Sequence, residues 1–185
     1  YGSHENYQYA RSTDFSVMAQ ALIPFFVARQ VVIGAGRMGR GEFGEEPGFQ
    51  ISQRADYIEQ EISLETTLNR GIINTRDEPH AIHDDFGRLH VIIGDANMSQ
   101  TSTLLKLGMT SLVLDAIEQG VDFSDLRLQD AVAEVPRVSR DLSLQHRLEL
   151  ADARQLTALE LLAEYRARLT PRTPTDHKVL AAWDE

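Results

Sequence analysis

Six of the chain's twelve glycines lie in one short segment, from Gly34 to Gly48, together with Pro47. Glycine loses more conformational freedom in a helix or strand than any other residue, and proline lacks the N–H that a regular element needs. We therefore predict a loop. The segment opens with the pattern G-x-G-x-x-G, and Asp56 lies at a suitable distance for a ribose contact. The later glycines prevent the helix that must begin at such a pattern, so a dinucleotide site is disfavoured.

Three segments have the apolar spacing and the end signals of helices. Asp14 precedes the first, and Pro24 can bend it. Gly120 is a stop signal for the second. Thr157 and Glu160 have the spacing of a capping box at the start of the third. The predicted helices cover residues 15–33, 99–119 and 156–169.

Five shorter segments alternate apolar and polar residues or are rich in β-branched residues, as strands are. The predicted strands cover residues 49–53, 57–62, 71–76, 89–93 and 147–150. Pro79 and Gly87 supply turn chemistry between the third and fourth, which predicts an antiparallel pair joined by a long functional loop. Strands and helices in runs, within 185 residues, favour a single α+β domain.

Charge and composition exclude several classes of protein. The chain carries 18 basic and 28 acidic residues, a formal net charge of −10, which argues against a nucleic-acid partner. It has no cysteine, so disulfides and thiol catalysis are excluded, and a cytoplasmic location is favoured. No uninterrupted apolar run reaches the roughly 18 residues of a membrane span, and no signal-peptide pattern is present. We expect no membrane association.

The two ends of the chain resemble interior sequence. The chain starts at Tyr1, directly in a dense polar motif, and stops at Glu185 without a closing element. We therefore expect a piece of a longer protein.

Two polar pairs have the two-residue spacing that places side chains on one face of a strand. His4 and Asn6 form the first pair, and Arg88 and His90 form the second. Arginine suits phosphate and histidine suits a metal. The alternatives are that the histidines are ordinary hydrogen-bonded residues and that Arg88 only pairs with an acidic neighbour, Asp84 or Asp85.

A third cluster surrounds Pro79, in the string Arg76-Asp77-Glu78-Pro79-His80. Such a density of charge beside a proline is typical of a functional loop. From the residues alone, the candidate phosphate and metal site comprises His4, Asn6, Arg76, His80, Arg88 and His90.

Covalent serine catalysis is disfavoured, because the chain contains no G-x-S-x-G elbow. The polar residues after the fourth strand have a simpler interpretation, in which Asn97 or Ser99 caps the helix that follows.

Four longer strings resemble the family of Pup ligases and Pup deamidases/depupylases. They are residues 1–7, 52–57, 72–81 and 88–97. The resemblance covers residues 1–169 and implies a glutamine-synthetase-like fold, with a curved antiparallel sheet that cradles ATP and Mg²⁺ and helices packed behind it. Residues 1–169 would be the central part of the catalytic domain, and residues 170–185 a linker or the start of a helical segment.

Within the family, the chain is more similar to depupylases than to ligases, at Ser3 and at residues 49–52, 57–59 and 64–68. The implied reaction is deamidation of the C-terminal glutamine of Pup and cleavage of the isopeptide bond between Pup and a substrate lysine. The implied partners are Pup and pupylated proteins, with a functional link to the proteasome. The runner-up is a Pup–protein ligase.

A non-catalytic Pup-binding protein is the other alternative. An acidic partner such as Pup would then need basic docking residues, for which Arg11, Arg29 and Arg37 are candidates.

The resemblance also implies roles for individual residues. His4 and His90 match metal-shell positions, and Asn6, Arg88 and Arg76 match nucleotide contacts. The remaining matches, which would lie near the nucleotide or the substrate, are Glu78 and His80.

The resemblance places no catalytic residue in this chain, because the family's catalytic aspartate and several acidic metal ligands precede the position of Tyr1. Residues 1–185 alone are therefore expected neither to bind ATP tightly nor to hydrolyse Pup. The chain departs from the family at Ile82, His83 and Gly87, in the loop before the strand.

Overall fold

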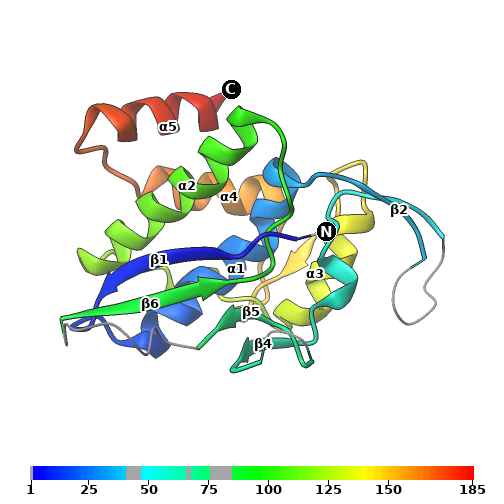
Figure 1. Ribbon diagram of the computed structural model, residues 1–185, viewed down its shortest axis with the longest axis horizontal. Helices are drawn as coiled ribbons and strands as arrows, with labels where there is room; N and C mark the ends of the chain where they lie inside the picture. The colour runs from blue at the N-terminus through cyan, green and yellow to red at the C-terminus, as the bar shows by residue number, and fades with distance from the viewer. Residues whose placement is uncertain (1, 41–46, 66–67, 76–84) are drawn as a thin grey trace.

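The computed structural model describes residues 2–40, 47–65, 68–75 and 85–185, which form an α+β fold (Figure 1). The helices are α1 (Phe15–Ile33), α2 (Gln100–Glu118), α3 (Ala131–Arg140), α4 (Ala158–Ala167) and α5 (Pro174–Asp184), with 3-10 turns η1 (Ala55–Tyr57) and η2 (Ser124–Leu126). The strands are β1 (Glu5–Ala10), β2 (Arg37–Gly39), β3 (Gly48–Gln50), β4 (Gln60–Ser63), β5 (Gly71–Asn74), β6 (Phe86–Val91), β7 (Leu148–Glu149) and β8 (Gln155–Leu156).

The main sheet has four strands in the order β1-β6-β5-β4. β6 is antiparallel to both of its neighbours, and Asn6 lies opposite His90 in the register between β1 and β6. The predicted antiparallel pair of residues 71–76 and 89–93 is therefore confirmed where the structure describes it. β4 departs from the expected antiparallel pattern, because it pairs parallel to β5 at the edge of the sheet.

β1 has one buried and one exposed face. Glu5 and Tyr7 are buried, whereas His4, Asn6 and Gln8 between and beside them are exposed. This alternation follows from the two-residue period of a strand. The buried face of the strand packs on α2.

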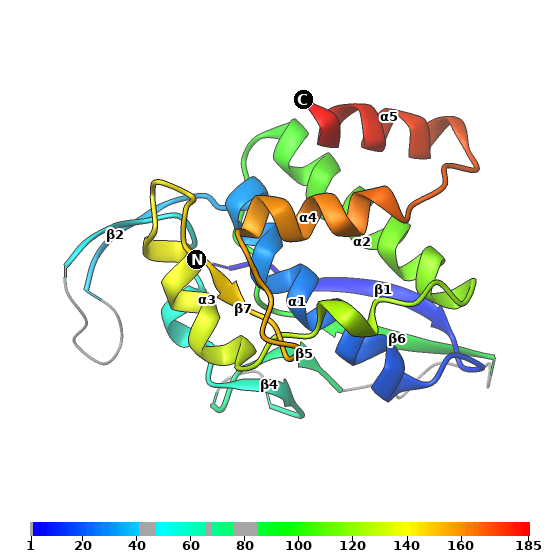
Figure 2. The same cartoon turned by 180° about the vertical axis from the view of Figure 1, so that it is seen from behind.

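α1 forms the centre of the core and contacts α2, α3, α4 and β5 (Figure 2). Its Phe25 ring lies 5.4 Å from the ring of Tyr165 in α4, which in turn stacks on Phe123 at 4.9 Å. The Tyr165 hydroxyl donates a hydrogen bond to the carbonyl of Ala21 at 2.6 Å, so the one polar atom of this aromatic cluster has a partner.

The predicted limits of α1 are confirmed. The Asp14 carboxylate accepts hydrogen bonds from the backbone N–H groups of Ser16 and Val17, which otherwise lack partners at a helix start. Among the described residues, this helix alone is long and apolar enough to cross a membrane by length and composition. Of that apolar window, 72% is buried within the molecule, as expected for a core helix.

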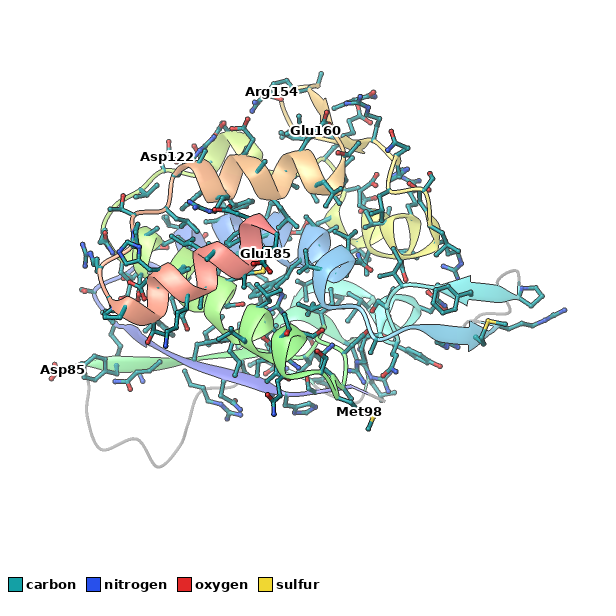
Figure 3. The ribbon with its side chains drawn as sticks, turned by 90° about the horizontal axis from the view of Figure 1, so that it is seen from above. Asp85, Met98, Asp122, Arg154, Glu160 and Glu185 are labelled. Carbon is teal, nitrogen blue, oxygen red and sulfur yellow. The ribbon has the colours of Figure 1, made fainter. Side chains whose placement is uncertain are left out.

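Ser99 is the residue that caps α2. Its hydroxyl accepts from Ser102 N, whereas the Asn97 amide donates to the carbonyl of Ile33 at the end of α1, at 2.7 Å. Met98 between them is exposed (Figure 3). The helix stops where Gly120 adopts a positive φ of 83°.

The prediction for residues 34–48 was partly wrong. β2 and β3 pair as a two-stranded ribbon at the two ends of this segment, with Met38 opposite Phe49. Gly36 and Gly39 keep positive φ values of 77° and 118°, which only glycine adopts readily. No helix begins at Gly34, so the dinucleotide interpretation is excluded here. The prediction also missed α3, and the strand predicted over residues 57–62 begins only at Gln60 in the structure, because Tyr57 belongs to the turn η1.

Candidate nucleotide-phosphate site

The four polar residues singled out on two strands meet on the face of β1 and β6 that lies away from the helices, here called the open face, although His90 itself is only 3% exposed. His4 and Asn6 lie at the start of β1, and Arg88 and His90 lie on β6, with Asn6 directly opposite His90. The register brings together pairs that are more than 80 residues apart in the sequence. The two-residue spacing therefore correctly predicted that each pair shares one face, although residues 4–6 were not among the predicted strands.

Two direct contacts link the strands on this face. Arg88 Nε donates to Asn6 Oδ1 at 2.7 Å, and His90 Nε2 lies 3.2 Å from His4 Nδ1. The first contact ties the Nε atom of Arg88 to β1. Arginine commonly recognises phosphate oxygens through its planar guanidinium group.

A complete magnesium site is not built from the described residues. Within residues 2–40, 47–65, 68–75 and 85–185, no group of three or more histidine, cysteine or acidic residues is placed to hold a metal. His4 and His90 supply only imidazole nitrogens, whereas Mg²⁺ prefers six oxygen ligands. The described donors alone therefore do not fit Mg²⁺, and the metal role of the two histidines stays a prediction.

Three further residues singled out in the sequence, Arg76, Glu78 and His80, lie outside the described residues. Their predicted roles near the nucleotide or the substrate stay predictions. In the sequence they lie between β5 and β6, which are neighbouring strands of the main sheet.

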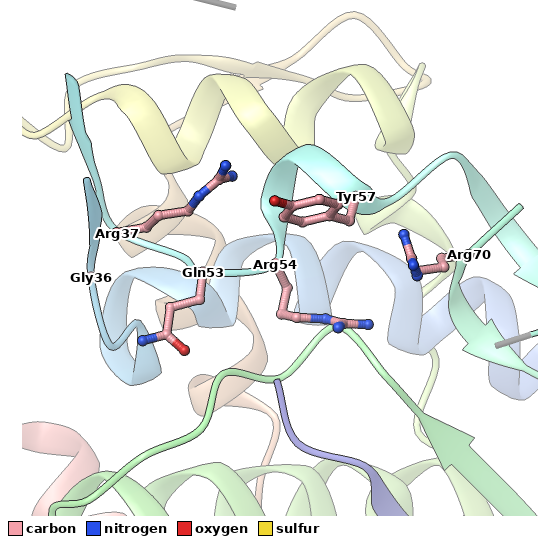
Figure 4. Close-up of a pocket in the computed structure, with 6 residues that line it drawn as sticks. All are labelled: Gly36, Arg37, Gln53, Arg54, Tyr57 and Arg70. Carbon is pink, nitrogen blue, oxygen red and sulfur yellow. The ribbon is translucent and has the colours of Figure 1, made fainter. Parts of the chain in front are cut away.

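A pocket rich in arginine lies beside the start of β1. It has a volume of about 300 Å³ and is lined by Gly36, Arg37, Gln53, Arg54, Tyr57 and Arg70. Figure 4 shows these side chains converging from the ribbon, from the turn η1 and from the start of β5. Three guanidinium groups around one cavity, in a chain of net charge −10, indicate an anion site.

Arg54 is the most constrained of the three arginines. Its Nε atom is buried and has no hydrogen-bond partner among the described residues. Burial, followed by the neighbouring charge of Arg70, lowers the pKa of Arg54. A negatively charged ligand would offset both the burial of the Arg54 charge and its repulsion by Arg70.

Arg54 also connects the pocket to the open face. A Cβ atom on Gly2 would lie 2.4 Å from Arg54 Cδ and 2.7 Å from its Nε. The arginine therefore lies directly along the backbone of Gly2, two residues before His4. The prediction missed Arg54 as a site residue, although residues 52–57 formed one of the family-like strings.

The other pocket residues are held by protein contacts. Arg37 donates to Asp56 at 2.8 Å and lies 4.9 Å from the Tyr57 ring, and Arg70 lies 5.7 Å from the same ring. Asp56 also pairs with Arg140 of α3 at 2.7 Å. The carboxylate suggested by spacing as a ribose contact is thus buried in ion pairs that shape the pocket wall.

Arg29 cannot dock a partner, contrary to the expectation from the sequence. It is fully buried behind β1, where it donates to both carboxylate oxygens of Glu5 and to the hydroxyl of Thr110. Arg11 is exposed, and Arg37 lines the pocket.

Comparison with known proteins decides the family. The family model described as Pup-ligase protein matches residues 1–185. The chain belongs to the Pup-ligase family. It is 63% identical over 169 residues to a Pup deamidase/depupylase of Mycolicibacterium smegmatis, covering 91% of this chain and 34% of that protein. It is 48% identical over 170 residues to a Pup–protein ligase of an Arthrobacter species, covering 92% of this chain and 37% of that protein.

Two solved structures of this family share the fold. One is the Pup ligase PafA in complex with ADP, with a TM-score of 0.81 and 35% identity over the whole chain and 43% of that chain. The other is a complex between Pup and PafA, with a TM-score of 0.81 and 36% identity over the whole chain and 39% of that chain. The chain spans about a third of the length of the curated relatives it matches.

Proposed function

We propose that this chain supplies the nucleotide-phosphate part of an enzyme that deamidates the C-terminal glutamine of Pup and cleaves Pup–lysine isopeptide bonds. The observation that carries the proposal is the difference in similarity within one family. Identity is 63% to a Pup deamidase/depupylase and 48% to a Pup–protein ligase over nearly the same residues. Pup and pupylated proteins are the proposed substrates, with a functional link to the proteasome in the cytoplasm.

ATP is the proposed cofactor. The described residues fit its phosphates, because Arg88 is oriented by Asn6 on the open face and Arg54 has a buried Nε without a protein partner. The related PafA structure in complex with ADP supports a nucleotide in this family. When bound, ATP would supply phosphoryl oxygens beside the amide that is hydrolysed.

The proposed task of these residues is to bind and orient negative charge. Arg88 would contact phosphate oxygens with its terminal nitrogens, while Asn6 holds its Nε. Arg54 would contribute from the pocket beside Gly2. Fixed cations of this kind stabilise charge that develops on oxygen during amide hydrolysis, and they need no reorganisation to do so. Arg76, Glu78 and His80 are proposed to complete the site from the loop between β5 and β6.

We also propose that His4 and His90 lie in the shell of the metal ion. Oxygen ligands for Mg²⁺ would have to come from outside the described residues, as the family resemblance implies for the catalytic aspartate. For that reason residues 1–185 alone are proposed to be inactive.

The deciding experiment uses the longest reading frame that contains this chain. The purified protein is incubated with glutamine-ending Pup, ATP and Mg²⁺, and conversion of the terminal glutamine to glutamate is followed by mass spectrometry. We expect conversion by the wild type and its loss in His90→Ala. ATP-dependent conjugation of glutamate-ending Pup to protein lysines, without deamidation, would instead identify a Pup–protein ligase. Neither reaction, with intact Pup binding, would identify a non-catalytic Pup-binding protein.

A further inference from the structure

One buried carboxylate connects two of the segments that line the arginine pocket. Asp95 follows β6 and is only 2% exposed. Its Oδ2 accepts hydrogen bonds from Ala35 N at 2.8 Å and from Gln53 N at 2.9 Å. Its Oδ1 accepts from the Ser52 hydroxyl at 2.9 Å and from Gln53 N at 3.0 Å.

These partners belong to two separate loops. Ala35 precedes the pocket residues Gly36 and Arg37, and Gln53 precedes Arg54. Asp95 itself does not line the pocket. It therefore acts on the two loops from behind, through their backbones.

The same residue also holds the start of β1. Its carbonyl oxygen accepts from the Ser3 hydroxyl and from Lys106 Nζ, each at 3.0 Å. Ser3 N donates in turn to the carbonyl of Gly94 at 2.9 Å. Ser3 lies directly before His4 on the open face. Asp95 therefore fixes the position of the pocket loops relative to that face.

The donors to the carboxylate are backbone N–H groups and a hydroxyl, all of which require an acceptor. Burying a carboxylate costs free energy unless hydrogen bonds compensate it, and three donors do so here. An amide in its place would turn an N–H group towards a backbone N–H group or the Ser52 hydroxyl, and a backbone N–H group can only donate. The two carboxylate oxygens accept from both loops and so hold their backbones together.

We propose that Asp95 is a positioning residue that holds Arg54 and the loop of Gly36 at the correct distance from the start of β1 for nucleotide binding. This inference rests on the proposed nucleotide site. It assigns to Asp95 no contact with the ligand.

The test is a double-mutant cycle in the longest reading frame that contains the chain. The dissociation constant of ATP is measured by calorimetry for Asp95→Asn, for Arg54→Ala and for the double variant. Each single variant is expected to weaken binding about tenfold, the effect of losing one charged hydrogen bond. The loss in the double variant should be smaller than the product of the two single losses, because Asp95 acts in part through Arg54.

Glu134→Gln is the matched control. Glu134 is another buried carboxylate, but it lies in α3 and contacts Arg137 and His146 rather than the pocket. It should lower the melting temperature and leave the ATP affinity unchanged. Equal ATP affinity in Asp95→Asn and wild type, or losses that multiply in the double variant, would overturn the positioning role.

Two further measurements test the role of Asp95 if the Asp95→Asn variant does not fold or if the wild type binds no ATP. If Asp95→Asn does not fold, Ser52→Ala removes a single donor and should weaken ATP binding by a smaller factor in the same cycle. If the wild type binds no ATP, the proposed function fails, and amide hydrogen exchange then tests Asp95 alone. Faster exchange at Ala35 and Gln53 in the variant, with α1 unchanged, supports the positioning role, and unchanged exchange overturns it.

Discussion

Arg29 donates hydrogen bonds from its two terminal nitrogens to the two carboxylate oxygens of Glu5, each at 2.8 Å. Both side chains are almost completely buried, at 1% and 2% exposure. Arg29 also donates to the carbonyl of Lys106 and to Thr110, and the Tyr7 hydroxyl donates to Glu5. This ion pair joins β1 to α1 directly behind the open face, between His4 and Asn6.

Glu5→Gln should strongly destabilise the protein. The substitution leaves Arg29 buried without its counter-charge, which typically costs about 3–5 kcal/mol when one partner of a buried pair is removed. Urea unfolding of the longest reading frame checks this value.

The double variant Glu5→Leu with Arg29→Met provides the matched control. It removes both charges, so it should be clearly more stable than Glu5→Gln. A double variant less stable than the single one would show that the specific hydrogen bonds, rather than the unpaired charge, dominate.

Arg29 also illustrates what the sequence could not predict. Its segment reads as an apolar helix, and that helix was predicted with the correct ends. The position of a lone arginine in such a helix depends on whether another element supplies a partner. Glu5 is 24 residues away, and only the packing of α1 against β1 brings the two together.

The residues of the open face were easier to predict, because side chains two residues apart in a strand lie on the same face. The spacing of His4 with Asn6 and of Arg88 with His90 placed each pair on one side of its strand. The pairing of β1 with β6 then needed only that both segments lie in one sheet. The arginine pocket was missed because Arg37, Arg54 and Arg70 come from three segments with no common period.

Arg88→Ala should weaken ATP binding by about tenfold to a hundredfold, since hydrogen bonds to charged groups contribute about 1.5–3 kcal/mol. Arg88→Lys should recover little of this loss, because lysine lacks the planar fork that Asn6 orients. Calorimetric titration with ATP measures both variants.

Arg127→Ala is the control for Arg88, because Arg127 is an exposed arginine next to η2. Its ATP affinity should equal that of the wild type. Equal losses in the two alanine variants would mean that total charge, and not the contact geometry at Arg88, governs the affinity.

Gly2→Ala should weaken ATP binding without a large loss of stability. The added Cβ would approach Arg54 Cδ to 2.4 Å, so the flexible arginine must leave its place along the strand. Gly48→Ala is the matched control, because nothing lies within 4 Å of a Cβ there. Affinity that falls in the Gly48 variant as much as in the Gly2 variant would contradict the role of the Arg54 position.

Acid stability should depend on Asp125, on the face opposite the sheet. Hydrogen bonds from Arg168 first, and further contacts with Arg154, lower the pKa of this carboxyl from 3.8 to about 2 (Figure 3 labels Arg154). A carboxyl with a depressed pKa in the folded state stabilises the protein above its unfolded pKa. That contribution is therefore complete above about pH 4 and is lost as the pH falls towards 2.

Asp125→Asn removes this titration, so its melting temperature should fall less steeply than that of the wild type between pH 4 and about pH 2. Arg168→Gln should flatten the same interval, because the arginine is the main cause of the depressed pKa. Scanning calorimetry across this range measures the slopes. If both variants kept the wild-type slope, the acid sensitivity would have to arise from other carboxylates, and the ion pairs around Asp125 would be screened by solvent.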